Sequence, residues 1–388
     1  MADLKEMIIS SMPHGKETLQ EINILRKNGH DYRLEKGRIE AIVNKFHPKN
    51  LKLIVSEIIE VNDNAKTFRF VSVNGILPVF QGGQYLNIFI EIDGVRTSRP
   101  YSICSSCHQR GYYEITVARI ANGFVSDYFL DKVKVGDEFI STSPSGTFIF
   151  NPVFHSKKNV FIAGGSGITP FLSMLREILE SGIDREIILI YGCRNEDAVL
   201  FKDELTNMAT RHKNFNFYIV LSEAPEEYAG LKGFVDANCI KKLVGDLNDK
   251  TYYICGPQIM NDFVVKALKS LDIKDSMIRR EMFGARQDIQ NEPGWPNELT
   301  GKEKFLITVN GKQKIPALSG ESLLTSLERS GIRVNVCCRS GECSLCRVQL
   351  VSGKVFMPRG VLLRHADEKF GYIHSCKAYP LSDLSIQI

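Results

Sequence analysis

The spacing of apolar residues changes along this 388-residue chain, and each change predicts a different kind of structure. In the first fifty residues, apolar side chains recur every third or fourth position before the stop signals Gly29 and Pro48. They are Leu19, Ile22 and Leu25, and then Leu34, Ile39, Ile42, Val43 and Phe46. This spacing predicts two short amphipathic helices in a separate extension, residues 1–50. It leaves open whether the extension packs on the rest of the chain or binds a partner.

From Leu51 the apolar period becomes two, as in strands with one buried face. Alternation is clear in residues 51–55, 68–70 and 86–92, and turn residues follow at 62–64 and 93–94. Together these signals predict an antiparallel barrel of about six strands over residues 51–153.

Near Asn159 short, continuous apolar runs replace the alternation, at 160–163, 187–191, 217–221 and 252–255. Helical stretches separate these runs, which is typical of a parallel α/β domain, here residues 154–285. Asn, Pro and Gly are frequent in 286–303, which we expect to be a linker. Residues 304–388, with a helix at 322–330, form a compact mixed module. The fold class is therefore multi-domain.

Composition narrows the functional classes only slightly. A net charge of +4 gives no indication of nucleic-acid binding. No run approaches the roughly eighteen apolar residues that cross a bilayer, and the first eleven residues lack a signal pattern, so we expect a cytoplasmic protein without a membrane span. Residues 304–388 hold twelve Lys/Arg against six Asp/Glu. This excess predicts a partner with an acidic docking surface, although a scattered solvated surface explains it as well.

Four cysteines near the C-terminus carry the most specific chemical signal. Cys338, Cys343 and Cys346 are spaced five and three positions apart, and Cys376 follows at a distance. Thiolates with this spacing on one tight loop suit a [2Fe-2S] cluster. The small residues of the loop allow the backbone to curl and point its N–H groups at the sulfurs. These residues are Ser340, Gly341 and Ser344.

Other readings of the cysteines fit less well. Structural zinc usually takes two CxxC pairs, and here only Cys343 and Cys346 have that spacing. Disulfides also fit less well, because they form in oxidising compartments, whereas cytoplasmic thiols, as we expect here, stay reduced. Choosing Cys337 instead of Cys338 would place one residue too many before Cys343, so we expect Cys337 to be a packed neighbouring thiol.

A glycine-rich segment follows the first continuous apolar strand and precedes a helix. Its glycines allow a pyrophosphate to approach the backbone, Thr169 is a candidate cap, and Pro170 suits the first helical position. The candidate coenzyme-binding residues are Gly164, Gly165, Ser166, Gly167, Thr169 and Pro170. The segment departs from the GxGxxG pattern, and a tight turn without ligand remains an alternative.

Five motifs in this order resemble the ferredoxin-NADP reductase superfamily over residues 51–284. They are Arg99-Pro100-Tyr101-Ser102, Gly123-Phe124-Val125-Ser126, the glycine-rich segment, Cys255-Gly256-Pro257 and Glu281-Met282-Phe283-Gly284. Residues 305–388 resemble a plant-type ferredoxin of β-grasp fold. The whole chain is thus similar to single-chain reductases with a C-terminal [2Fe-2S] domain, such as those of phthalate dioxygenase, phenylacetyl-CoA epoxidase and hybrid cluster protein.

The resemblance implies a role for each motif. Arg99 binds the flavin phosphate, Tyr101 packs on the flavin ring, and Ser102 hydrogen-bonds near N5. Gly123, Val125 and Ser126 line the flavin pyrophosphate, while Cys255, Glu281 and Phe283 flank the nicotinamide, with Gly256 and Pro257 beside them. The implied cofactors are FAD, with FMN as the alternative, a [2Fe-2S] cluster and NADH. The alternatives are a packed aromatic at Phe283 and a small core residue at Cys255.

The choice of coenzyme follows from the residues after the strand ending at Leu221. A 2′-phosphate would favour Arg or Lys there, whereas this chain has Glu223, Glu226 and Glu227. A carboxylate repels a phosphate and accepts a hydrogen bond from a ribose hydroxyl. We therefore expect NADH to be preferred.

Electron counting predicts the order of the carriers. NADH supplies two electrons as a hydride and a [2Fe-2S] cluster accepts one, so a flavin must stand between them. The expected function is an NADH-dependent reductase that passes electrons through flavin and cluster to a partner metalloenzyme or oxygenase. Two alternatives are an electron-transfer subunit of a larger redox complex and a cluster-based redox sensor.

Overall fold

The computed structural model describes residues 2–28, 32–120, 123–281 and 288–388. These residues form two compact units, Met1–Lys49 and Asn50–Ile388, and each is described by itself. Among the described residues, the helices are all too short or too polar to cross a membrane.

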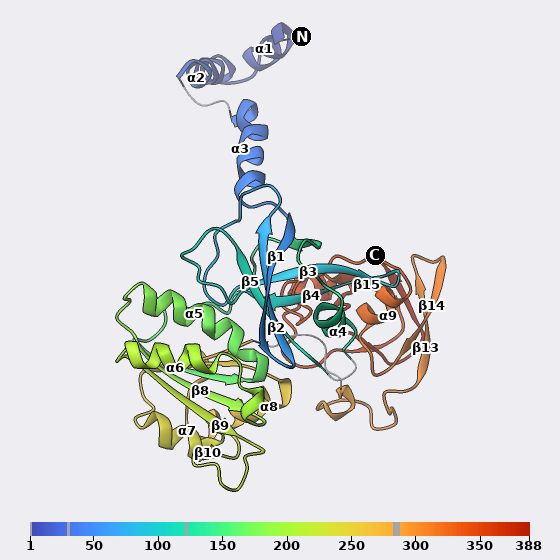
Figure 1. Ribbon diagram of the computed structural model, residues 1–388. Helices are drawn as coiled ribbons and strands as arrows, with labels where there is room; N and C mark the ends of the chain where they lie inside the picture. Colours follow the sequence, from blue (N-terminus) through green and yellow to red (C-terminus); the bar gives the residue numbers. More distant parts are fainter. Residues whose placement is uncertain (1, 29–31, 121–122, 282–287) are drawn as a thin grey trace. The chain divides into compact units, whose positions relative to one another are not determined.

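The first unit is helical, as predicted, but it contains one helix more than the sequence indicated (Figure 1). The helices are α1 (Ala2–Ser10), α2 (Gly15–Asn28) and α3 (Tyr32–Phe46). Met7 and Ile8 lie three and four positions after Leu4, which is helical spacing, but this short segment was not predicted as a helix. In α3 the side chains of Ile39, Ile42 and Phe46 are about half exposed.

The second unit begins with a six-stranded antiparallel sheet in the order β4-β3-β6-β1-β2-β5, which confirms the predicted barrel. Alternation explains the strands: in β1, Leu51, Leu53 and Val55 are buried and the residues between them are more exposed. The elements are β1 (Asn50–Asn62), β2 (Ala65–Ser72), β3 (Tyr85–Ile92), β4 (Val95–Ser102), β5 (Tyr113–Ala118), α4 (Phe124–Asp131) and β6 (Glu138–Thr142).

A parallel sheet follows, in the order β10-β9-β8-β7-β11-β12, with helices on both faces. Its four central strands are the continuous apolar runs of the sequence. The strands are β7 (Lys158–Gly164), β8 (Glu186–Cys193), β9 (Phe215–Leu221), β10 (Leu231–Lys232), β11 (Lys250–Cys255) and β12 (Ile278–Glu281). The helices are α5 (Ile168–Glu180), α6 (Lys202–Arg211), α7 (Ala237–Val244) and α8 (Gln258–Ser270), with short 3-10 turns η1 (Gly165–Gly167), η2 (Glu196–Ala198) and η3 (Asp275–Met277).

The C-terminal module has a five-stranded sheet in the order β14-β13-β19-β15-β17, in which β19 pairs parallel with β13. Its elements are β13 (Lys304–Val309), β14 (Gln313–Leu318), α9 (Leu323–Arg329), β15 (Arg347–Ser352), β16 (Val355–Phe356), α10 (His365–Lys369), β17 (Tyr372–His374), β18 (Tyr379–Pro380) and β19 (Leu384–Gln387). Ser322 caps α9 with its side chain. The described part of the predicted linker contains η4 (Ile289–Asn291), and its Trp295 packs against Phe356 and Tyr379 of this module.

Candidate functional site

The loop that carries three of the four cysteines curls around a sulfur, as the sequence predicted. Backbone N–H groups of Ser340, Glu342 and Cys343 each donate to Cys338 Sγ at 3.4 Å. The curl requires a positive φ at Gly341 (86°), and two non-glycine residues of the loop, Arg339 (55°) and Ser344 (58°), share this left-handed conformation. A loop with donors aimed at a thiolate suits an iron–sulfur cluster.

The four thiols form two pairs. Cys343 lies beside Cys338, and its thiol together with the backbone N–H groups lowers the pKa of Cys338 to about 4. Cys376 lies beside Cys346 and lowers the pKa of that thiol in the same way. In the described part of the chain, no three His, Cys, Asp or Glu side chains converge as the ligands of one metal ion would. Four thiols arranged in two pairs suit a cluster of two irons.

Strand pairing brings the distant Cys376 to the loop. β15 starts directly after Cys346, and its Arg347 pairs with His374 at the end of β17. Ser375 then donates to the carbonyl oxygen of Cys346 through its backbone N–H, at 3.1 Å, and through its hydroxyl, at 2.7 Å. The sheet of the module therefore positions the predicted fourth ligand.

The predicted flavin motif, Arg99 to Ser102, forms the end of the edge strand β4. Tyr101 contacts Phe129 of α4, with ring centroids 5.6 Å apart, so β4 and the helix after Gly123 form one site. The hydroxyl of Ser102 is buried without a hydrogen-bond partner among the described residues. A buried unpaired hydroxyl is costly, and a flavin ring nitrogen would supply the missing partner.

The residues of the second flavin segment, Gly123 to Ser126, lie in different surroundings. Gly123 is the N-cap of α4, and the Ser126 hydroxyl accepts from the backbone N–H of Ile120 at 3.3 Å. Val125 is buried in the hydrophobic core of the barrel, which gives it a packing role. The start of α4 thus offers a helix N-terminus to an anion, with Val125 as its anchor.

The glycine-rich turn and the Cys255-Gly256-Pro257 loop lie against each other because β7 and β11 are neighbours in the sheet. A Cβ on Gly167 would lie 2.2 Å from the carbonyl oxygen of Cys255, and one on Gly164 would lie 2.1 Å from Met260 Sδ. Gly165, with a φ of 51°, has open space where a Cβ would stand. Two of these glycines therefore allow close packing, and Gly165 leaves room for a ligand.

The predicted helix cap is wrong. Gly167 is the N-cap of α5, so Thr169 and Pro170 are the second and third helical residues. The Thr169 hydroxyl instead donates to the carbonyl oxygen of Ser166 at 3.0 Å, while Ser166 itself is exposed. The boundary moves because η1 runs directly into α5. Pro170 is still tolerated there, since N–H groups of the first turn have no helical partner.

Cys255 and Glu281 end neighbouring strands and pair with each other in the β11–β12 ladder. Both are buried, and Glu281 Oε2 has no hydrogen-bond partner among the described residues. Burial, reinforced by the charge of Glu342, raises the pKa of Glu281 well above its usual range. The structure therefore brings together two of the residues predicted to flank the nicotinamide, whereas Phe283 lies outside the described residues.

Glu223 follows β9, as expected, and its side chain is exposed. However, the guanidinium Nε of Arg194, which follows β8, lies 3.8 Å from Glu223 Oε1. Sequence reasoning missed this cation, because Arg194 is remote from Glu223 in the chain and reaches it only through the parallel pairing of the two strands.

The cluster loop docks on β3, the strand that pairs with the flavin-motif strand β4, and these contacts were also not predicted. Asn87 Nδ2 donates to the carbonyl oxygen of Val336 at 3.0 Å, and Tyr85 Oη lies 3.7 Å from Cys337 Sγ. Tyr85 is the direct β-ladder partner of Ser102. Cys337 is thus a packed thiol, as expected, but it packs on the barrel. One signal was available: Tyr85 belongs to the alternating strand before the flavin motif.

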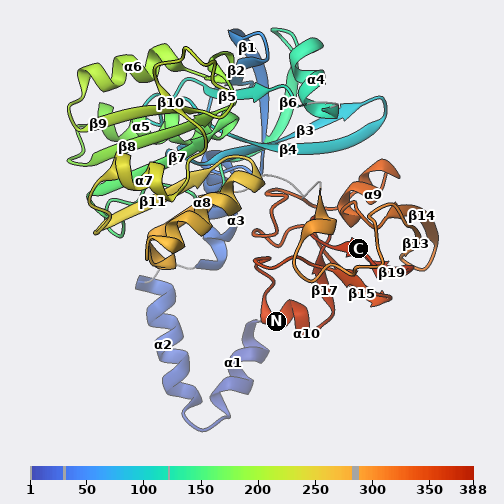
Figure 2. The ribbon, with the colours of Figure 1, turned by 90° about the horizontal axis from the view of Figure 1, so that it is seen from below.

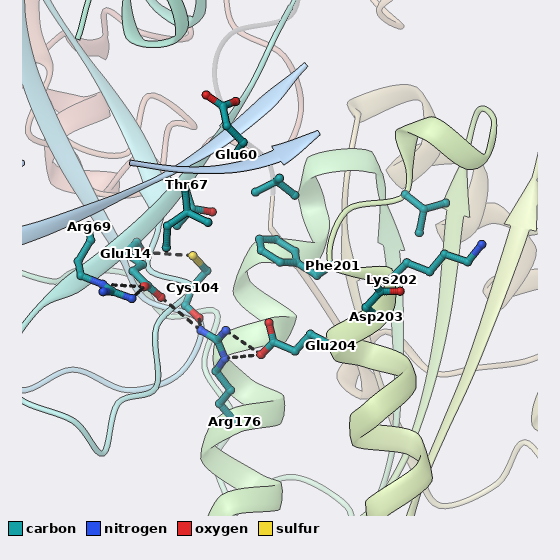
Figure 3. Close-up of a pocket in the computed structure, with 13 residues that line it drawn as sticks. Glu60, Thr67, Arg69, Cys104, Glu114, Arg176, Phe201, Lys202, Asp203 and Glu204 are labelled. Carbon is teal, nitrogen blue, oxygen red and sulfur yellow. Dashed lines mark hydrogen bonds and ion pairs between the residues drawn. The ribbon is translucent and has the colours of Figure 1, made fainter. Parts of the chain in front are cut away.

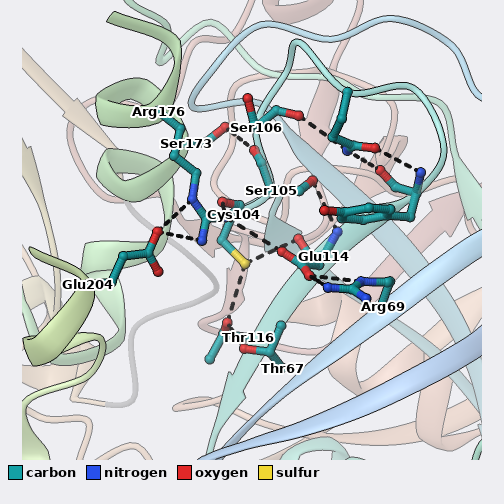
Figure 4. A network of polar contacts seen from close by, with 12 residues as sticks. Thr67, Arg69, Cys104, Ser105, Ser106, Glu114, Thr116, Ser173, Arg176 and Glu204 are labelled. Carbon is teal, nitrogen blue, oxygen red and sulfur yellow. Dashed lines mark hydrogen bonds and ion pairs between the residues drawn. The ribbon is translucent and has the colours of Figure 1, made fainter. Parts of the chain in front are cut away.

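A polar cavity of about 440 Å³ lies elsewhere in the second unit, and none of the predicted site residues line it (Figure 3). At its wall, Arg176 of α5 pairs with Glu204 of α6 at 2.7 Å and with Glu114 of β5 at 3.6 Å. Glu114 also accepts from Arg69 of β2, as Figure 4 shows. This network joins the barrel to the α/β domain.

Comparison with known proteins agrees with the three-part site. Residues 52–150 match the model of the oxidoreductase FAD-binding domain, 161–266 that of the oxidoreductase NAD-binding domain, and 307–381 that of the 2Fe-2S iron-sulfur cluster binding domain. The glycine betaine monooxygenase reductase subunit of Pseudomonas aeruginosa is 27% identical over 343 residues, 85% of this chain and 93% of that protein.

Two further relatives extend the comparison. NADH-cytochrome b5 reductase 1 of Dictyostelium discoideum is 32% identical over 252 residues, 63% of this chain and 85% of that protein. The solved structure of phthalate dioxygenase reductase matches with a TM-score of 0.65 and 26% identity, and it covers 87% of this chain and 98% of that one.

The chain belongs to the ferredoxin-NADP reductase superfamily, in the group that carries a C-terminal plant-type [2Fe-2S] ferredoxin domain. Within that group it is an NAD(P)H-dependent oxidoreductase that uses FAD and a [2Fe-2S] cluster. A bound flavin would supply the conversion of a hydride into the single electrons that a [2Fe-2S] cluster accepts.

Proposed function

We propose that this chain is the reductase component of an oxygenase system and delivers single electrons from NADH to a separate metalloprotein. The observation that carries the proposal is the direct contact between the cluster loop and β3, the strand that pairs with the flavin-motif strand β4, at Tyr85–Cys337 and Asn87–Val336. The names of two relatives, glycine betaine monooxygenase reductase subunit and phthalate dioxygenase reductase, support an oxygenase as the acceptor.

Specific residues hold the two organic cofactors in this proposal. Arg99 and the start of α4 bind the flavin phosphates, Tyr101 packs on the flavin ring, and Ser102 forms a hydrogen bond with N5 of that ring. The loops after β7 and β11 bind the coenzyme, and Cys255 and Glu281, paired at the ends of neighbouring strands, flank the nicotinamide. Glu223 accepts a hydrogen bond from the ribose of NADH.

The acceptor is expected to dock where the cluster lies nearest to solvent. Leu345, between Ser344 and the ligand Cys346, is 52% exposed, so the loop backbone offers a short path to the surface there. The excess of Lys and Arg in residues 304–388 favours an acceptor with an acidic docking surface.

Affinity purification of the tagged full chain from its source, with cross-linking and mass spectrometry, tests the proposal. We expect a separately isolated oxygenase or other metalloprotein that cross-links near Leu345 and accepts electrons from the NADH-reduced chain. Constant stoichiometric recovery inside a larger assembly, with no transfer to a separate protein, would instead support the subunit alternative. A cluster that NADH does not reduce through the flavin would support the sensor alternative.

A further inference from the structure

Arg339, the residue after the ligand Cys338, is buried against the barrel. Its side chain is 9% exposed, and its Nη2 donates to Thr97 Oγ1 of β4 at 3.1 Å. The same nitrogen forms an ion pair with Glu328 of α9. A charged side chain inside a loop of small residues therefore connects the cluster loop to the edge strand of the flavin domain.

Thr97 is the centre of this contact. Its Oγ1 accepts a second hydrogen bond, from Arg99 Nη1 at 2.7 Å, and donates to Glu328 Oε2 at 3.1 Å. One oxygen atom thus lies between the guanidinium that we assign to the flavin phosphate and the guanidinium on the cluster loop. In both views of the ribbon, α9 lies beside β4 (Figures 1 and 2).

The charges at this contact are not balanced. Arg99 and Arg339 bring two positive charges, and Glu328 brings one negative charge. Arg339 Nε is buried without a partner among the described residues. Burial, and next the charge of Arg339, lower the pKa of Arg99 to about 10. A buried site with an extra cation and an unpaired N–H donor favours the binding of an anion.

We propose that Arg339 is a positioning residue that couples flavin binding to the docking of the cluster loop. The inference rests on the proposed role of Arg99 in binding the flavin phosphate. A phosphate on Arg99 offsets the repulsion between the two guanidinium groups, so Arg339 and its loop dock more firmly when flavin is present. By thermodynamic reciprocity, a docked Arg339 raises the affinity for flavin.

Two neighbouring contacts also hold the cluster loop against the barrel. Val336 and Cys337, which precede the cluster ligand, contact Asn87 and Tyr85 of β3. Movement of Arg339 away from Thr97 would therefore displace the loop that holds Cys338 from the strands that hold the flavin ring. The distance between the two carriers, and with it the rate of electron transfer, depends on this contact.

The test uses the full chain with both cofactors and four variants at the contact. Arg339→Gln removes the charge and Arg339→Lys keeps it. Thr97→Val removes the shared hydroxyl and Thr97→Ser keeps it. Both substitutions lie on β4 and leave the sequence of the cluster loop unchanged. Arg329→Gln is the matched control, because Arg329 lies on α9 and pairs with Glu321 inside the ferredoxin module.

Two quantities are measured: the flavin dissociation constant, by titrating flavin-free protein, and the rate at which NADH-reduced flavin reduces the cluster. We expect Arg339→Gln and Thr97→Val to raise the dissociation constant and lower the rate by about tenfold each, within the usual range of coupling between sites. Arg339→Lys and Thr97→Ser should keep most of the flavin affinity and most of the rate. Arg329→Gln should match the unmodified chain in both quantities.

The failures are distinguishable. If Arg99→Gln binds flavin normally, the assignment of Arg99 is wrong and the coupling fails with it. If Arg99→Gln weakens flavin binding while Arg339→Gln and Thr97→Val do not, the coupling alone is wrong. If Arg339→Gln loses iron, Thr97→Val decides the matter, and a normal flavin affinity in that variant overturns the proposal.

Discussion

At the scale of single residues, some contacts follow from neighbours in the sequence, and others form only in the folded chain. Ser340, Gly341 and Ser344 predicted a tightly curled loop, and the three N–H bonds to Cys338 confirm it. Arg194 beside Glu223 and Arg339 beside Thr97 were not predictable in the same way. Each pair meets only through the tertiary fold, whereas the curl of the cluster loop follows from neighbouring residues.

Coenzyme preference is decided at the residue scale. Glu223→Arg places a second cation beside Arg194, at the position where we propose that the adenosine ribose binds. We expect the ratio of kcat/KM for NADH over NADPH to fall by about tenfold, or on the order of 1.4 kcal/mol. Steady-state kinetics with both coenzymes measure the ratio. Glu186→Arg serves as the control, because Glu186 is exposed and belongs to no predicted site. An unchanged ratio would contradict the assignment of Glu223.

The buried carboxyl of Glu281 makes stability depend on pH. Because its pKa is raised in the folded protein, its contribution to stability is fully present below the unfolded pKa and is lost as pH rises toward the folded pKa. Glu281→Gln has no such loss. We expect the Tm of the variant, relative to the unmodified chain, to increase from pH 6 to pH 8.5. A Tm difference that does not change over this range would show that Glu281 ionises normally.

At the scale of elements, continuous apolar runs predicted the central parallel strands, and alternation predicted the barrel. The pattern was sufficient because burial on one or both faces determines it. It failed for the start of α5, where the cap depends on how η1 closes its hydrogen bonds. In α1 the helical spacing of Leu4, Met7 and Ile8 was present but was not used in the prediction. The described part of the expected linker, with its composition typical of loops, is held to the ferredoxin module by Trp295.

The network around Arg176 holds two elements of the α/β domain to the barrel. Arg176→Met would remove the ion pair with Glu204 and the longer contact with Glu114, which keeps Arg69, and we expect a loss of about 1.5–3 kcal/mol in the free energy of unfolding. Thermal unfolding followed by flavin fluorescence measures the effect. Lys157→Met, which breaks the exposed pair with Asp184, should cost at most about 1 kcal/mol. Equal effects of the two variants would contradict a structural role for the network.

At the scale of the whole molecule, the order of the three cofactor domains follows from the motifs, but their contacts do not. Tyr85 and Cys337 are 252 residues apart in the chain, and no periodicity relates them. In the proposed function, the ends of β4, β7, β11 and β12 and the cluster loop each carry part of one electron path. The account's central claim concerns that path: electrons from NADH reach the cluster through the flavin.

Rapid anaerobic mixing with NADH tests this claim most directly, comparing the unmodified chain with Cys343→Ser, which lacks one cluster ligand. In the unmodified chain, bleaching of the flavin should precede the electron paramagnetic resonance signal of the reduced cluster. In Cys343→Ser the bleaching should persist and the cluster signal should be absent. Reduction of the cluster before the flavin, or loss of flavin bleaching in the folded variant, would contradict the account.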